Sequence, residues 1–186
     1  ELNNELEKAL GAPVNVVNDT AAVAMGEAHF GAAQGHSIVA YITVSTGVGG
    51  ARVVDGEIDR RVYGFEPGHQ YIDFDNTLCP DCASGTLEDM VSGTATEKRF
   101  GVKPYEVMDR NLWEVELPQW LAYGLTNTIL HWSPDIVVLG GSMVVGDPAI
   151  SVNPHTSDFV KEYASPYLPE VPEIVAAGLG DEGGLY

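Results

Sequence analysis

Apolar residues recur along this chain with the spacings that distinguish helices from strands. Leucines four residues apart predict an amphipathic helix over residues 2–10, and Leu121, Leu125 and Ile129 predict a longer one over residues 117–132. Further helices are expected over residues 21–30, 87–92, 94–100, 105–110 and 157–167. Short apolar runs bounded by turn residues predict strands over residues 14–17, 37–45, 50–54, 57–62, 135–139 and 172–177.

The order of these elements predicts the fold class. Asp55-Gly56 is a two-residue turn signal, so the strands on either side of it should pair antiparallel. The predicted order is a strand–helix unit, a three-stranded meander, several helices, and then strand, helix, strand. This order predicts an α/β protein with a mixed sheet. With 186 residues, 45% of them hydrophobic, the chain suits one domain or one lobe of a larger protein.

The chain is strongly acidic, with 9 basic against 27 acidic residues and a net charge of −18. This charge argues against a sequence-independent nucleic-acid face or an anionic membrane surface. It suits a neutral, hydroxyl-rich substrate, or a phosphate that arrives with a divalent cation. No apolar run reaches membrane-spanning length and no leader opens the chain, so a cytoplasmic protein is expected. The chain opens in a helix without an initiator Met, which suggests a fragment.

The stretch from Tyr41 to Val54 reads as a strand, a tight Ser/Thr/Gly turn and a returning strand. Its glycines allow a sharp bend or a close approach of the backbone to a ligand. Backbone N–H groups and the hydroxyls of Ser45 and Thr46 can then meet phosphate oxygens. An ordinary hairpin explains the same pattern, and this stretch alone does not choose between them.

Asn18-Asp19 lies where a predicted strand meets a predicted helix, a place where ligands are often held. Both residue types are also common helix caps, so a purely structural role is equally open. Gly140-Gly141-Ser142 follows another predicted strand and is suited to a ligand lying close to the backbone.

Residues 63–84 are irregular and hold the densest chemistry. Glu66 and His69 flank a Pro-Gly turn that can direct both side chains to one side. Cys79 and Cys82 are too close in sequence for an easy structural disulfide, so metal binding or redox chemistry is expected. His69, Cys79 and Cys82 are three zinc-capable ligands, and a fourth would have to come from a carboxylate such as Asp81, Asp73 or Asp75.

Taken together and in this order, these motifs resemble the ROK family of repressors, open reading frames and sugar kinases. The resemblance implies an actin-like ATPase fold, with two ribonuclease-H-like lobes around a cleft. It runs from about Val14 to Tyr186 and corresponds to the larger C-terminal lobe. Residues 1–186 are therefore expected to form this single lobe, with residues 63–84 as an irregular insert. The family's N-terminal phosphate-loop lobe is absent.

The resemblance also assigns roles. Asp19 matches the general base that accepts the proton of the attacking sugar hydroxyl. The residues implied to hold the sugar are Asn18, Glu66, His69 and Glu88. The second phosphate loop corresponds to Ser45, Thr46, Gly47, Gly49 and Gly50, and the turn beside the adenosine to Gly140, Gly141 and Ser142. ATP and Mg²⁺ are implied as cofactors, a hexose or amino sugar as substrate, and a homodimer as the assembly.

The chain departs from the family pattern at the cysteine cluster. With Glu88 aligned, Cys79 matches the first family cysteine, Asp81 and Thr86 stand at the next two, and Cys82 falls one residue out of place. The implied zinc site at His69, Cys79 and Cys82 is therefore incomplete. Gly64-Phe65 also replaces a run of small residues before Glu66, which weakens any inference about the sugar.

Two functions follow from the resemblance. A glucokinase-like enzyme would transfer the γ-phosphate of ATP to a hexose hydroxyl, and the Asn-Asp pair favours it because a regulator needs no base. The alternative is a sugar-sensing transcriptional regulator whose DNA-binding part lies outside this chain. The isolated lobe is expected to be inactive, because half of a cleft cannot enclose ATP.

Overall fold

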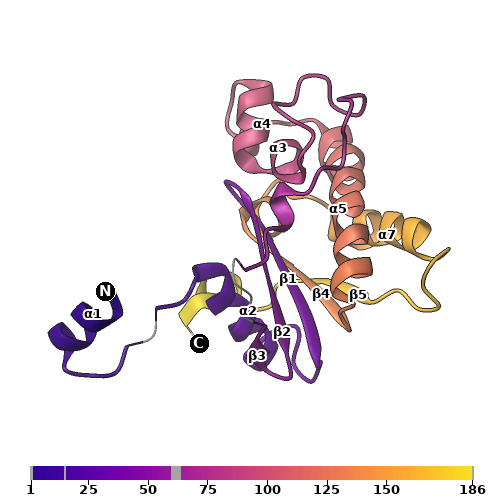
Figure 1. Ribbon diagram of the computed structural model, residues 1–186. Coiled ribbons are helices and arrows are strands. Elements are labelled where there is room, and N and C mark those ends of the chain that lie inside the picture. The colour runs from indigo at the N-terminus through magenta and orange to yellow at the C-terminus, as the bar shows by residue number, and fades with distance from the viewer. Residues whose placement is uncertain (1, 15, 60–63, 186) are drawn as a thin grey trace.

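The computed structural model describes residues 2–14, 16–59 and 64–185 (Figure 1). The helices are α1 (Leu2–Leu10), α2 (Asp19–Phe30), α3 (Leu87–Val91), α4 (Gly93–Phe100), α5 (Leu117–Trp132), α6 (Ser142–Val145) and α7 (Ser157–Ala164). The strands are β1 (Ile38–Val44), β2 (Val48–Val54), β3 (Glu57–Ile58), β4 (Ile136–Gly140) and β5 (Glu173–Ala176). The short helical turns are η1 (Pro67–His69), η2 (Pro104–Glu106) and η5 (Gly180–Leu185), and two π-helical stretches are η3 (Leu112–Glu116) and η4 (Val152–Thr156).

The strands form one mixed sheet in the order β3-β2-β1-β4-β5. β1 pairs antiparallel with β2, with Ile42 opposite Gly50, and parallel with β4, with Ala40 opposite Val137. β4 in turn pairs parallel with β5. The predicted α/β class with a mixed sheet is confirmed, and the carboxyl ends of β1, β4 and β5 meet at one edge.

Helices cover both faces of the sheet (Figure 1). Successive side chains of β1 alternate between the faces, as strand geometry requires. Ala40, Ile42 and Val44 join the large core that includes residues of α3, α5 and α7. Val39 and Tyr41 join a smaller core beneath α2. The sheet therefore holds α2 on one side and the α3–α5–α7 layer on the other.

α5 has the bounds predicted from its leucine spacing. Leu121, Leu125 and Ile129 are at most 2% exposed and lie in the large core. Ser133 ends the helix in the left-handed conformation, with φ +49°, and its N–H donates to the carbonyl of Ile129. The apolar period and the following Pro134 together account for both ends of the helix.

Two predicted strands are corrected. Val14, Val16 and Val17 do not form a strand, and Val16 and Val17 are about half exposed, because the sheet offers them no neighbouring strand to pair with. The strand predicted over residues 57–62 is confirmed only for Glu57–Ile58, and residues 60–62 lie outside the described residues. The short β3 leaves most of β2 as an edge of the sheet.

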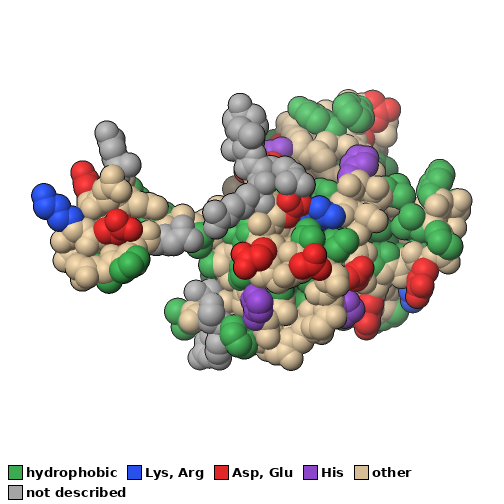
Figure 2. All heavy atoms as spheres, turned by 60° about the horizontal axis from the view of Figure 1, so that its bottom comes forward, with side chains coloured by type: hydrophobic (Ala, Val, Ile, Leu, Met, Phe, Trp, Pro, Cys, Tyr) green, Lys and Arg blue, Asp and Glu red, His purple; other side chains and the backbone are tan. Residues whose placement is uncertain are grey.

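α1 forms as predicted but buries none of its residues. It stands apart from the rest of the molecule in both views (Figures 1 and 2). Acidic side chains outnumber basic ones on the face drawn in Figure 2, in keeping with the net charge. Across the described ranges, no helix combines the length and the apolar character that a bilayer crossing requires.

Candidate functional site

The Asn-Asp pair begins α2. The side chain of Asn18 accepts a hydrogen bond from the N–H of Ala21 at 3.3 Å, so the predicted capping role is confirmed. Asp19 is exposed, and its Oδ1 accepts from the N–H of its neighbour Thr20 at 2.7 Å. This bond orients the Asp19 carboxylate at the start of the helix and leaves its second oxygen available to a ligand.

The turn between β1 and β2 is hydrogen-bonded to the corner where α3 meets α4. The N–H of Gly93 donates to the carbonyl of Ser45 at 2.7 Å, and the N–H of Thr94 donates to the carbonyl of Thr46 at 3.3 Å. Glu88 accepts from the N–H of Val48 at 2.8 Å. The turn is therefore fixed before any ligand binds, which favours a preorganised phosphate contact.

Two backbone amides of this turn already donate hydrogen bonds within the protein, so fewer of its N–H groups are free to meet a phosphate than the sequence predicts. Ser45 donates its N–H to the carbonyl of Gly47, and Val48 donates to Glu88. Within the described part of the chain, the amides of Thr46 and Gly47 have no such partner. A Cβ on Gly47 would lie 2.6 Å from Oε2 of Glu88, so a side chain there would displace the carboxylate that accepts from Val48. Thr46 and Gly47 thus carry the free backbone donors.

A central cavity of about 430 Å³ brings the predicted base and the loop together. Its lining consists of Asp19, Thr20, Val23, Tyr41, Thr43, Ser45, Thr46, Gly47, Val48, Gly49 and Glu88. Glu88, predicted as a sugar contact, therefore faces the same cavity as Asp19 while also supporting the turn. Burial raises the pKa of the Tyr41 phenol, as does the nearby Glu27 carboxylate, so this group is a neutral wall of the cavity.

A second cavity, of about 530 Å³, adjoins the central one and contains both Asn18 and Glu66. Arg52 and Asp59 also line it, and their Nη1 and Oδ2 atoms lie 2.6 Å apart in an ion pair. The pair was not predicted, because an isolated Arg in a strand and an Asp after a turn carry no local signal. The polar and charged groups that line this cavity make it suitable for a hydroxyl-rich ligand.

The Glu66–His69 turn reaches this position by packing closely on β2. A Cβ on Gly50 would lie 2.6 Å from the Pro67 ring, and a Cβ on Gly68 would lie 2.3 Å from the carbonyl oxygen of Val48. The glycines therefore allow the turn to contact the strand directly. Glu66 lines the second cavity, whereas His69 is exposed and lines none of the three cavities described here.

The close contact at Gly68 leads to a prediction. Replacing Gly68 by Ala is expected to lower the free energy of unfolding by about 1–3 kcal/mol, because the new methyl group collides with a strand carbonyl that has little freedom to move. Urea denaturation of this chain measures the change. A variant as stable as the wild type would show that the turn does not pack on β2 in this way.

A third cavity, of about 360 Å³, lies on the other side of the turn. Its lining consists of Ser45, Thr46, Gly93, Thr94, Glu97, Lys103, Pro104, Tyr105, Ser142, Met143, Gly146, Asp147 and Pro148. The hydroxyls of Ser45 and Ser142 lie 3.1 Å apart. Of the predicted Gly140-Gly141-Ser142 turn, only Ser142 reaches the cavity. Gly140 packs under the Tyr41 hydroxyl, and Gly141, with φ +88°, packs against the carbonyl of Val44.

Lys103 is the cation of this third cavity, and no motif in the sequence marks it. A hydrogen bond from its ammonium group to Glu97 raises the pKa of Lys103, so the side chain stays charged at neutral pH. Lys103 lies in a loop between α4 and η2 and shows no periodicity that would have marked it. Only the fold places this charge beside the Ser45–Thr46 turn.

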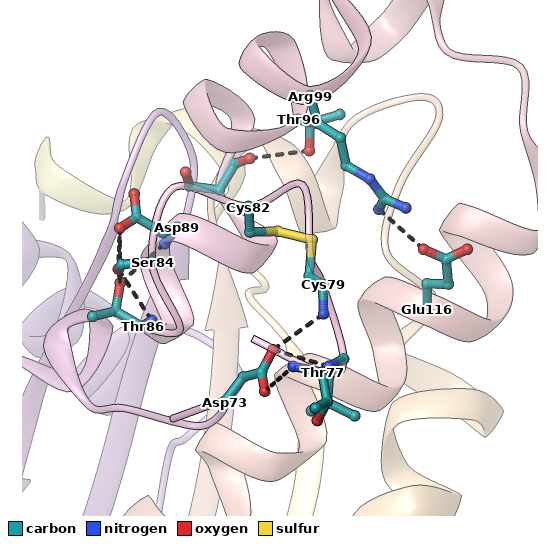
Figure 3. The surroundings of a disulfide bond; sticks show 12 residues. Asp73, Thr77, Cys79, Cys82, Ser84, Thr86, Asp89, Thr96, Arg99 and Glu116 are labelled. Carbon is teal, nitrogen blue, oxygen red and sulfur yellow. Dashed lines mark hydrogen bonds and ion pairs between the residues drawn. A yellow bond between two sulfur atoms is a disulfide. The ribbon is translucent and has the colours of Figure 1, made fainter. Parts of the chain in front are cut away.

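The predicted zinc ligands do not come together. Cys79 and Cys82 form a disulfide, with their Cα atoms 5.3 Å apart (Figure 3). The expectation that their spacing is too short for a disulfide was wrong, because this separation lies within the usual range for a bonded pair. Disulfide sulfurs are not thiolate ligands, and no three His, Cys, Asp or Glu side chains form a metal-binding group among the described residues. The prediction of zinc at His69, Cys79 and Cys82 is corrected accordingly.

Asp73, which was considered as a fourth zinc ligand, organises the disulfide loop instead. It is 4% exposed, and its carboxylate accepts from the N–H groups of Thr77, Leu78 and Cys79 at 3.0–3.1 Å (Figure 3). Asp75 accepts from the hydroxyl of Thr77, which lowers the pKa of Asp75. Both carboxylates therefore stabilise the loop conformation.

Comparison with known proteins identifies the family. The sequence model of the ROK family matches residues 1–186. The chain belongs to the ROK family. The match confirms the resemblance found in the separated motifs, and the mixed sheet with helices on both faces is the ROK fold, of the actin-like ATPase type.

Relatives of this ROK chain include enzymes and a regulator. It is 27% identical over 97% of its length to the xylose repressor of Bacillus spizizenii, and 29% identical over 96% to the fructokinase of Zymomonas mobilis. It spans 50% of the repressor and 62% of the fructokinase.

Solved structures of two ROK kinases also match the chain. It superposes over 99% of its length on the ROK hexokinase of Thermus thermophilus, with a TM-score of 0.79 and 30% identity. The ROK glucokinase of Streptomyces griseus, solved with glucose and AMPPNP, matches over 99% with a TM-score of 0.77 and 27% identity. The chain covers 68% and 69% of those two proteins.

Proposed function

We propose that this chain is the catalytic half of an ATP-dependent hexose kinase and that the N-terminal part found in its relatives completes the cleft. The observation that carries the proposal is the order of the three cavities. The second and central cavities share Thr20 and Gly49, and the central and third cavities share Ser45 and Thr46. Asp19 therefore lines the cavity between the one that contains Asn18 and Glu66 and the one that contains Lys103, Glu97, Asp147 and several hydroxyls.

In this proposal the sugar occupies the second cavity and the nucleotide the third. Asn18 and Glu66 bind sugar hydroxyls, and Lys103, Thr94 and Ser142 contact the nucleotide. The hydroxyls of Ser45 and Thr46 and the free amides of Thr46 and Gly47 face the transferring phosphate. The glucokinase relative solved with glucose and AMPPNP supports this pairing of ligand types.

The reaction requires one proton acceptor and accurate positioning. The attacking sugar hydroxyl loses its proton to the free oxygen of the Asp19 carboxylate. Its oxygen forms a bond to the γ-phosphorus as the bond to the bridging oxygen of ADP breaks. The Glu88 carboxylate and the hydroxyl oxygens of Thr20, Ser45 and Thr46 around the central cavity fit a hard cation such as Mg²⁺. Mg²⁺ would supply charge neutralisation on the phosphates. Zinc has no place in this proposal.

The test is sugar phosphorylation by the full-length protein. With ATP, Mg²⁺ and a panel of hexoses and amino sugars, we expect ADP release that depends on one or a few sugars, with one sugar phosphate formed per ADP. Mass spectrometry of the product identifies the phosphorylated sugar. Background ATP hydrolysis without sugar is the control.

The repressor relative makes sugar sensing the second candidate, because it matches 97% of this chain. A regulator would bind a sugar without turning it over. Sugar binding by calorimetry, together with no sugar phosphate from any member of the panel and sugar-dependent DNA binding by the full-length protein, would replace the kinase proposal by this one.

A further inference from the structure

Glu27 is a fully buried carboxylate for which the proposed mechanism has no use. It is 0% exposed. Oε2 accepts hydrogen bonds from the N–H groups of Ala32 at 2.8 Å and Gly178 at 3.1 Å, and Oε1 accepts from that of Leu179 at 2.9 Å. Buried carboxylates are costly unless they are fully hydrogen-bonded, and here three backbone donors meet that requirement.

The bonds from Gly178 and Leu179 join segments about 150 residues apart in the sequence. Glu27 lies near the end of α2, whereas Gly178 and Leu179 follow β5. Beside the carboxylate the two segments nearly touch, since a Cβ on Gly26 would lie 2.3 Å from the carbonyl oxygen of Gly183. Glu27 therefore clamps α2 to the turn that leaves the carboxyl end of β5.

Elsewhere in α2, the exposed His29 side chain hydrogen-bonds the carbonyl oxygen of Gly56 at 2.9 Å. The buried residues of α2 are Ala24, Gly26 and Glu27. Apart from the partly buried Val23 and Met25, small residues form most of the packing surface of α2, which has few of the long side chains by which packed helices interlock. Dispersion forces hold such a helix against the sheet but discriminate weakly between small shifts along its axis. Hydrogen bonds are directional, so the buried Glu27 carboxylate can fix the position of α2 along its axis.

The position of α2 matters because Asp19 is its first residue. Asp19 and Glu27 are eight residues apart, about 12 Å along one rigid helix. The turn that Asp19 must face is hydrogen-bonded to α3 and α4, and among the described residues no hydrogen bond joins it to α2. A shift of α2 therefore changes the distance from Asp19 to the Ser45–Gly49 turn, while the nucleotide cavity, which α2 does not line, stays as it is.

We propose that Glu27 is a positioning residue, whose clamp on Gly178 and Leu179 holds Asp19 at the distance from the phosphate loop that phosphoryl transfer requires. This inference rests on the proposed kinase function. It assigns Glu27 no contact with the substrate or the nucleotide.

The test replaces Glu27 by Gln in the full-length protein. Gln has the same shape as Glu, but its NH₂ group is a hydrogen-bond donor. Backbone N–H groups that now donate to a carboxylate oxygen would face this NH₂ group instead. We expect kcat to fall about 10- to 100-fold, since displacements near 1 Å have effects of this size on catalysis, while KM for ATP stays within about threefold. Glu162→Gln, the same change at an exposed position of α7, is the control and should leave both constants unchanged.

A structural role alone would lower the stability of Glu27→Gln and leave its kinetics intact at temperatures where it is folded. A kcat within twofold of the wild type would therefore overturn the inference, and so would a loss of kcat with an equal rise in KM for ATP. Wild-type protein without hexose-dependent turnover would contradict the proposed function itself.

Hydrogen exchange measures the clamp without any activity. The amides of Gly178 and Leu179 should be protected in the wild type and exchange at least about tenfold faster in Glu27→Gln. The amides of Ala21 and Ala22, at the Asp19 end of α2, should accelerate with them. Unprotected amides in the wild type would overturn the inference even if the variant does not fold. In a folded variant, acceleration confined to Gly178 and Leu179 would overturn it whether or not the protein is a kinase.

Discussion

Replacing Asp19 by Asn in the full-length protein is expected to lower kcat for hexose phosphorylation by about 10²–10⁴-fold, the usual contribution of a positioned general base. Asn has the shape of Asp but cannot accept the proton of the attacking hydroxyl at neutral pH. Its carbonyl oxygen can still accept from the N–H of Thr20, so the start of α2 is preserved. The loss should therefore appear in kcat, with smaller changes in KM for the sugar and for ATP.

Steady-state kinetics with the preferred hexose, together with urea unfolding curves, separate a chemical effect from a structural one. Asp158→Asn is the matched control, because Asp158 is an exposed acidic residue in the first turn of α7. The control should keep wild-type kinetics. If Asp19→Asn retains more than a tenth of the wild-type kcat, Asp19 is not the base.

Replacing Leu121 by Ala is expected to lower the free energy of unfolding by about 2–5 kcal/mol, the range for a buried Leu that leaves a cavity. Leu121 is 0% exposed and lies in the large core between α5 and the sheet. That loss is a large fraction of the stability of an ordinary domain, about 5–15 kcal/mol. Urea unfolding of this chain measures the difference in midpoint at constant slope.

The same helix supplies the control for this prediction. Leu130 is 40% exposed, so Leu130→Ala removes the same atoms from a position that solvent already reaches. We expect it to cost less than about 1 kcal/mol, in proportion to the smaller apolar area that it removes from burial. If Leu121→Ala and Leu130→Ala lower the free energy of unfolding equally, α5 does not pack against the core with the face that carries Leu121.

Where neighbouring residues in the sequence determine structure, the predictions were accurate. The four-residue spacing of Leu121, Leu125 and Ile129 predicted α5 with its correct ends, because the helical period and Pro134 act locally. The cap at Asn18 and the β1–β2 hairpin were predicted for the same reason. The strand predicted over Val14–Val17 failed, because an apolar run becomes a strand only where a neighbour is available to pair with it.

The candidate site was only partly predictable. The positions of Asp19, Glu66, Glu88 and the loop from Ser45 to Gly49 follow from the motifs, and the structure places all of them in adjoining cavities. The pairing of Cys79 with Cys82 was missed, because spacing alone says little about the loop that Asp73 folds around them.

By itself, the sequence determined the class of this protein, most of its helices and strands, and the candidate site residues, although the helix predicted over residues 105–110 is only the short turn η2. These depend on periodicity, caps and motif spacing, which act over a few residues. Only the tertiary structure decided which groups meet: Arg52 with Asp59 beside Asn18, Lys103 beside the Ser45 turn, and Glu27 with Gly178. Such contacts depend on how strands and helices from distant parts of the chain are brought to one edge of the sheet, and no local pattern contains that information.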